Sequence, residues 1–94
     1  MDADRMLKEI GEEVQNVSNL LNEIENSLKK VSNELHITEK LPDEEYIAQI
    51  NHVNELLWES KIYNRKREAL EEILDYLHSF QYGIVAIQDL KENL

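Results

Sequence analysis

The chain has 94 residues, with 20 acidic side chains against 10 basic ones and a formal net charge of −10. This length corresponds to one domain with a thin core, and the negative charge disfavours binding to nucleic acid phosphates and to anionic membrane surfaces. The absence of cysteine excludes disulfides and thiolate metal sites, and the two glycines and single proline disfavour sheets and glycine-rich phosphate loops.

The chain shows no targeting or membrane-spanning segment. Its first ten residues, MDADRMLKEI, are acidic and amphipathic, unlike a basic and apolar secretion signal. The longest uninterrupted apolar run, residues 84–87, is far too short to cross a bilayer. We therefore expect a protein without membrane association, located in the cytoplasm.

The first half of the chain carries apolar residues at alternating spacings of three and four. This is the heptad pattern of helices that pack along a narrow seam. The seam residues are Leu7, Ile10, Val14, Val17, Leu21, Ile24, Leu28, Val31 and Leu35. They predict a helix over residues 4–36, and small flanking residues such as Gly11 and Ser18 favour packing in a bundle over a two-stranded zipper.

A turn is expected at residues 37–42. Pro42 is followed by three carboxylates, a pattern typical of the first turn of a helix. A connection this short implies an antiparallel neighbour, with a second helical arm over residues 43–93. The sequence therefore predicts an all-α fold in a single domain: an antiparallel helical hairpin or small helical bundle with heptad (coiled-coil) packing.

The second arm shows two apolar registers. One begins at Tyr46 and ends at Leu57, and the other begins at Leu70 and continues through Ile73, Leu77 and Phe80 to the end of the chain. The slip between them predicts either a stutter in one long helix or a break near residues 60–66. Residues 80–83 are a second candidate for a break, because Gly83 weakens a helix.

A tight turn places residues whose numbers sum to about 80 side by side. The first helix would then cover the second arm only to about residue 75, leaving Phe80, Ile84, Ile87 and Leu94 beyond its end. Burying such side chains is worth about 1.5 to 3 kcal/mol each. We therefore expect a third helix, a second protomer or a different protein to cover them.

The sequence contains no evident catalytic or metal-binding constellation. His52-x-x-Glu55 and Asp75-x-x-His78 have a suitable spacing, but the additional converging ligands of a di-iron bundle are missing. The carboxylates lie at solvent-facing helix positions or caps, without the shaped pocket that acid–base catalysis needs. We predict no enzymatic activity, no cofactor and no metal.

Four of the ten basic residues lie within residues 61–67. This cluster is either a patch for phosphate or an acidic partner, or it pairs within the chain. A residue sum of about 80 places Arg65 to Arg67 opposite Glu12 and Glu13, and this internal pairing is the interpretation we favour.

All aromatic residues lie at or after Tyr46, and aromatic side chains are enriched at interface hot spots. The candidate partner-binding residues are Trp58, Tyr63, Phe80, Tyr82, Ile84 and Ile87. We expect a non-enzymatic protein–protein interaction module that presents an apolar helical face and an acidic surface to another protein. A self-assembling coiled-coil oligomer is the alternative.

The layout of a long helix, a Pro–Asp turn and a second arm with a register change resembles two groups of small proteins. One group is the helical hairpins of secretion-system subunits and their chaperones. The other is the helical immunity or inhibitor proteins of bacteria and phages. The resemblance is one of layout, without a shared motif, and it implies a protein that acts as an inhibitor, adaptor or chaperone.

Overall fold

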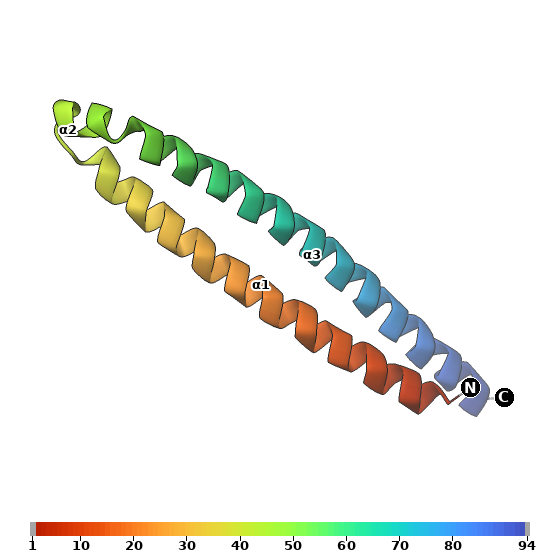
Figure 1. Cartoon of the computed structure of the whole chain (residues 1–94). Helices are drawn as coiled ribbons and strands as arrows, with labels where there is room; N and C mark the ends of the chain where they lie inside the picture. Colours follow the sequence, from red (N-terminus) through yellow and green to blue (C-terminus); the bar gives the residue numbers. More distant parts are fainter. Residues whose placement is uncertain (1, 94) are drawn as a thin grey trace. The chain divides into compact units, whose positions relative to one another are not determined.

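The computed structural model describes residues 2–93 and contains three helices in chain order (Figure 1). Helix α1 spans Ala3–Glu39, α2 spans Asp43–Ala48 and α3 spans Ile50–Glu92. No strand occurs within residues 2–93, so the all-α prediction is confirmed. Leu94, which the sequence analysis placed in the uncovered end of the second arm, lies outside the described residues.

The chain divides into two compact units, which are described separately. Unit 1 consists of the residues up to Leu21 and those from Ala69 onward, and it pairs the first part of α1 with the last part of α3. Unit 2 consists of residues 22–68 and contains the rest of α1, all of α2 and the first part of α3. Because its two long segments are joined through the turn and run in opposite directions, unit 2 is a helical hairpin, as predicted.

Helix α1 continues beyond residue 36 to Glu39 because Thr38 extends its buried face. The Thr38 side chain is buried, and its Oγ1 donates a hydrogen bond to the carbonyl oxygen of Glu34 at 2.8 Å. The helix then ends in a tighter turn, in which Lys40 and Leu41 donate to the carbonyls three residues earlier.

Helix α2 begins where the sequence predicts, directly after Pro42, with three carboxylates in its first turn. It ends at Ala48, because Gln49 leaves the helical conformation with φ −105° and ψ 15°. Helix α3 follows at once, and the Val53 N–H donates to the Gln49 carbonyl at 3.0 Å. The second arm is thus divided at Gln49, and α3 runs without interruption through residues 60–66 and 80–83.

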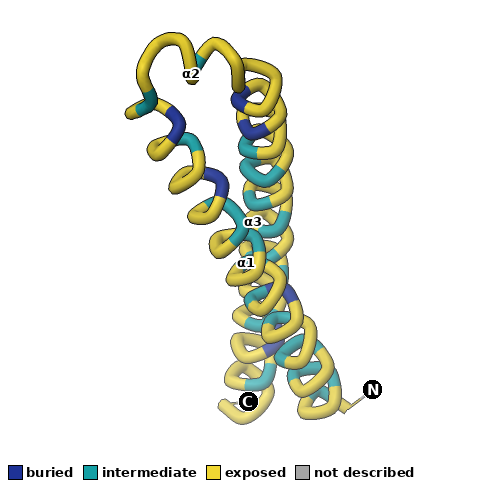
Figure 2. The backbone as a smooth tube through the Cα atoms, turned by 60° about the vertical axis from the view of Figure 1, so that its left-hand side comes forward, coloured by how far each residue is buried: buried dark blue, intermediate teal, exposed yellow. Residues whose placement is uncertain are grey.

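The seam of α1 is the face of that helix that packs against α3. All nine seam residues are buried or half-buried, and Val17 and Val31 are the most enclosed of them (Figure 2). The apolar spacing of the sequence therefore identifies this face of α1 correctly within each unit.

The corresponding inward face of α3 differs from the one that the sequence predicts. Apart from Asn64, the residues of α3 that are not exposed follow one unbroken spacing of three and four. They are Val53, Leu56, Ser60, Tyr63, Arg67, Leu70, Leu74, Leu77, Gln81, Ile84 and Gln88. The predicted register slip is wrong, because Ser60 and Arg67 occupy inward positions and interrupt the apolar pattern without interrupting the packing.

The pairing register of the two long helices also differs from the prediction. In unit 1 the Gln88 amide donates to the Asp4 carboxylate at 3.3 Å, and in unit 2 the His52 Nε2 lies 3.7 Å from the Glu34 carboxylate. The residue numbers of these pairs sum to 92 and 86 rather than to 80, because the turn and α2 occupy residues 40–49. The predicted overhang is therefore wrong: in unit 1, α1 accompanies α3 to its last turns, and Ile84 is buried.

Candidate functional site

Helix α3 carries a second series of apolar residues on a face other than its inward one. We call this series the α3 stripe; its members are Ile73, Tyr76, Phe80, Gly83, Ile87 and Leu90. Their spacing again alternates between three and four, and all of them belong to unit 1. The first five each directly precede an inward residue, so the stripe runs along one flank of the buried face. Every side chain of the stripe is exposed, Phe80 to 62%.

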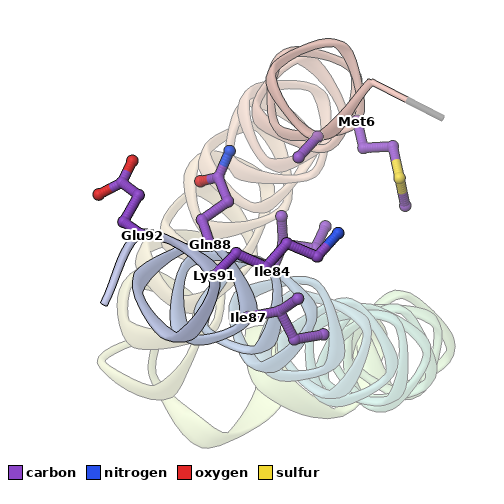
Figure 3. A pocket seen from close by; sticks show the side chains of 7 residues that line it. Met6, Ile84, Ile87, Gln88, Lys91 and Glu92 are labelled. Carbon is purple, nitrogen blue, oxygen red and sulfur yellow. The ribbon is translucent and has the colours of Figure 1, made fainter. Parts of the chain in front are cut away.

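Two hollows in unit 1 adjoin the stripe. A hollow of about 350 Å³ is lined by Tyr76, Ser79, Phe80, Gly83, Ile84 and Ile87. A second hollow, of about 420 Å³, is lined by Ala3, Met6, Ile84, Ile87, Gln88, Lys91 and Glu92. In the second hollow Gln88 points from α3 toward α1, whereas Glu92 points away (Figure 3). Both hollows are lined by Ile84 and Ile87, so they adjoin each other along the last turns of α3.

The hollow of about 350 Å³ lies in an uncharged part of a highly charged chain, whereas the other hollow is lined in part by Lys91 and Glu92. Residues 76–88 contain no Asp, Glu, Lys or Arg, although these residue types make up 32% of the sequence. Asp75 and Asp89 bound this segment on either side. An apolar surface without charges at its centre and with charges at its edges has the composition of a protein interface.

The structure places only some of the predicted partner-binding residues on this surface. Phe80 and Ile87 belong to the stripe, and Tyr82 is 79% exposed on another face of α3. Ile84 is buried in the core of unit 1, and Tyr63 is half-buried on the inward face in unit 2. Ile84 therefore contributes to the floor of the two hollows and not to the exposed stripe, and Tyr63 belongs to neither.

The sequence analysis assigned several stripe residues to the wrong surface. Its second register placed Ile73, Phe80 and Ile87 in one seam with Leu77 and Ile84. The structure separates them, because Leu77 and Ile84 lie on the inward face whereas the other three are exposed. The second half of α3 has more apolar residues than one narrow seam can hold. This excess was the signal in the sequence that α3 has two apolar faces.

Trp58, another of the candidate partner-binding residues, belongs to unit 2 and not to the stripe. Its side chain is exposed, and the Lys61 ammonium lies 5.3 Å from the centroid of its ring. A cation over an exposed ring contributes about 0.5–1 kcal/mol, so Trp58 already has a favourable neighbour within the chain.

The basic cluster has local neighbours as well. Arg67 lines a hollow of about 300 Å³ in unit 2 together with Glu25, Leu28, Lys29 and Ser32. The Lys66 ammonium lies 6.0 Å from the centroid of the Tyr63 ring. The predicted pairing of Arg65 to Arg67 with Glu12 and Glu13 depended on the residue sum of 80, which is wrong, so that pairing loses its basis.

The described residues do not form a metal site. Within residues 2–93, no three His, Asp or Glu side chains converge on a point where an ion could bind. His78 instead lies 3.2 Å from the Gln81 side-chain oxygen, and His52 lies beside Glu34. Both histidines therefore have neighbours at the protein surface.

The α3 stripe and the two hollows beside it are thus the candidate functional site of the chain. None of the helices formed by residues 2–93 has the length and apolar character of a membrane-spanning segment. Comparisons of the chain with family models, with curated proteins and with solved structures found no match.

Proposed function

We propose that the chain is a non-enzymatic protein–protein interaction module whose binding surface is the α3 stripe. The observation that carries this proposal is a second heptad-spaced apolar face on a helix whose first such face is already packed against α1. A helix that is apolar on one side needs one neighbour, and a helix that is apolar on two sides needs two. The second neighbour is the partner.

The energetics of the stripe support a binding role. Full burial of a Phe, Ile or Leu side chain is worth about 1.5–3 kcal/mol. The spacing of the stripe is the one that recurs where a helix lies in an apolar groove of a partner. The aromatic pair Tyr76 and Phe80 near its centre has the character of an interface hot spot.

The remaining surface supports a protein as the partner. Its acidity disfavours nucleic acid and anionic membranes, as the sequence analysis expects. We further propose that α1 and α3 pack as an antiparallel coiled coil, supported by the matching three-and-four spacing of their inward faces, and that the module acts in the cytoplasm. Both an inhibitor, adaptor or chaperone for a foreign protein and a self-assembling oligomer fit such a module.

A matched pair of charge substitutions tests the proposal. Phe80 and Tyr82 are both exposed aromatic residues of α3, but only Phe80 lies on the stripe. Tagged wild type, Phe80→Glu and Tyr82→Glu are used to capture partners from cells that naturally make the protein, with the eluates quantified by mass spectrometry. We expect a stoichiometric partner, either foreign or an untagged copy of the chain, to bind the wild type and Tyr82→Glu and to be lost with Phe80→Glu.

The same partners in equal amounts with all three baits would contradict a role for the stripe. Circular dichroism of each variant provides the folding control. Since both substituted side chains are exposed, all three proteins should have the same helix content.

A further inference from the structure

We propose that the occupant of the α3 stripe is a second copy of this chain, packed antiparallel to the first so that Phe80 of each copy lies over Gly83 of the other. This inference rests on the proposed function, because it names the partner of the proposed binding surface. Three features of the stripe carry it: the glycine at its centre, the apolar counterpart that one offset gives to each member, and the absence of charge around it.

No contact or backbone conformation within the chain requires a glycine at position 83. It lies in the interior of α3 with a helical backbone and no positive φ, and a Cβ atom added there would meet nothing within 4 Å. Glycine in a helix interior costs about 1 kcal/mol relative to alanine, so neither conformation nor packing within the chain favours it. A bulky group that arrives from outside would need the space that a side chain at this position would fill.

The stripe supplies such a group three residues away. In an antiparallel helix pair, opposing residues have numbers with a constant sum. The offset that places Phe80 opposite Gly83 also places Tyr76 opposite Ile87 and Ile73 opposite Leu90. Each contact occurs twice because of the twofold symmetry, so one offset gives every stripe residue an apolar counterpart.

The charge distribution favours a second copy over a cationic partner. Two chains of net charge −10 repel each other unless their contact surfaces are free of acidic groups. Residues 76–88 meet this condition, and the antiparallel offset places the small, uncharged Ser79 of one copy beside Ala86 of the other. A cationic partner would find its nearest α3 carboxylates, Asp75 and Asp89, only outside this segment.

The dimensions of the stripe set the expected strength of the dimer. Residues 73–90 extend over about 26 Å of helix and are one helix wide. The contact is therefore smaller than a standard protein interface, and we expect a reversible dimer with a Kd of roughly 1–100 μM.

Sedimentation velocity of the full chain over about 1–500 μM tests the association directly. We expect the wild type and Tyr82→Glu to shift from monomer to dimer within this range. Phe80→Glu should remain monomeric because each dimer would bury two unpaired carboxylates. Gly83→Leu should also remain monomeric, because the leucine side chain would occupy the space that Phe80 of the other copy needs. The inference would be overturned if the wild type is monomeric at every concentration. It would also be overturned if the Phe80→Glu variant dimerises as well as the wild type.

Cross-linking tests the orientation, since the natural chain has no cysteine. Ser79→Cys and a mass-tagged Ala86→Cys are mixed and treated with a short bismaleimide. The antiparallel offset predicts that the mixed product exceeds both products formed between identical chains. If the cross-linked product between the two variants is no more abundant than the product between two Ser79→Cys chains, the offset is wrong.

The two proposals fail in distinguishable ways. If the pure chain is monomeric at every concentration but Phe80→Glu still loses a foreign protein in the capture experiment, the second-copy inference is wrong and the proposed function stands. If the chain is monomeric and Phe80→Glu changes no captured protein, both are wrong.

Discussion

At the residue scale, two β-branched side chains of α1 show how strongly position decides the effect of a substitution. Val31 is 6% exposed and lies on the packed face of unit 2, whereas Ile37 is 65% exposed on the same helix. An aspartate at position 31 would bury a carboxylate without a partner, and one at position 37 would remain in water.

We expect Val31→Asp to lower the free energy of unfolding by about 3 kcal/mol or more, and Ile37→Asp to change it by less than about 0.5 kcal/mol. Urea unfolding followed by circular dichroism measures both values. Equal stability of the two variants would mean that the α1 seam is not the core of unit 2.

The two glycines provide a second comparison between residues. Gly11 and Gly83 both lie inside long helices, and an added Cβ atom meets nothing within 4 Å at either position. We expect Gly11→Ala and Gly83→Ala each to stabilise the monomer by about 1 kcal/mol through helix propensity. Thermal unfolding of dilute protein measures the gain, and a loss of stability in either variant would reveal a contact that the helix geometry does not account for.

At the scale of the element, α1 was predictable and α3 only partly so. The nine seam residues of α1 are all apolar, so their spacing alone identifies the packed face. On α3, by contrast, Ser60, Arg67, Gln81 and Gln88 lie on the inward face, while the stripe residues are exposed. The apolar residues of α3 therefore belong to two faces. Their spacing alone does not distinguish the face that packs within the chain from the face that stays exposed.

The two adjacent leucines of α3 test the observed register. Leu56 is 3% exposed, whereas Leu57, which the sequence analysis placed in the seam, is 50% exposed. We expect Leu56→Ala to cost about 2–5 kcal/mol of stability and Leu57→Ala less than about 1 kcal/mol. Chemical unfolding of the two variants should show this order, and the reverse order would restore the predicted register.

At the scale of the whole chain, the sequence identified the hairpin but not its pairing. Pro42 and the acids after it marked the start of a helix, and α2 does begin there. The break at Gln49 has no proline or glycine to indicate it, so the separation of the short helix α2 from α3 was not anticipated. This difference moves the pairing sum from 80 to about 90 and removes the predicted overhang, although the prediction of uncovered apolar side chains at Phe80 and Ile87 was right for another reason.

The net charge of the whole chain predicts the salt response of the dimer. Two copies of charge −10 repel each other, and added salt screens this repulsion without weakening an apolar contact. We expect the dimer Kd to fall several-fold between about 0.05 and 0.5 M NaCl, as measured by sedimentation, with Phe80→Glu monomeric at both. Dissociation at high salt would indicate that opposite charges, and not the stripe, hold the copies together.

The two apolar faces of α3 also bear on how uniquely unit 1 folds. The inward face includes Gln81 and Gln88, and the residues directly before them, Phe80 and Ile87, are larger and more apolar. At these two positions unit 1 packs the less apolar side chain against α1 and leaves the more apolar one exposed. A partner bound to the stripe, as proposed, would stabilise this rotational position of α3 by mass action as well as cover its surface.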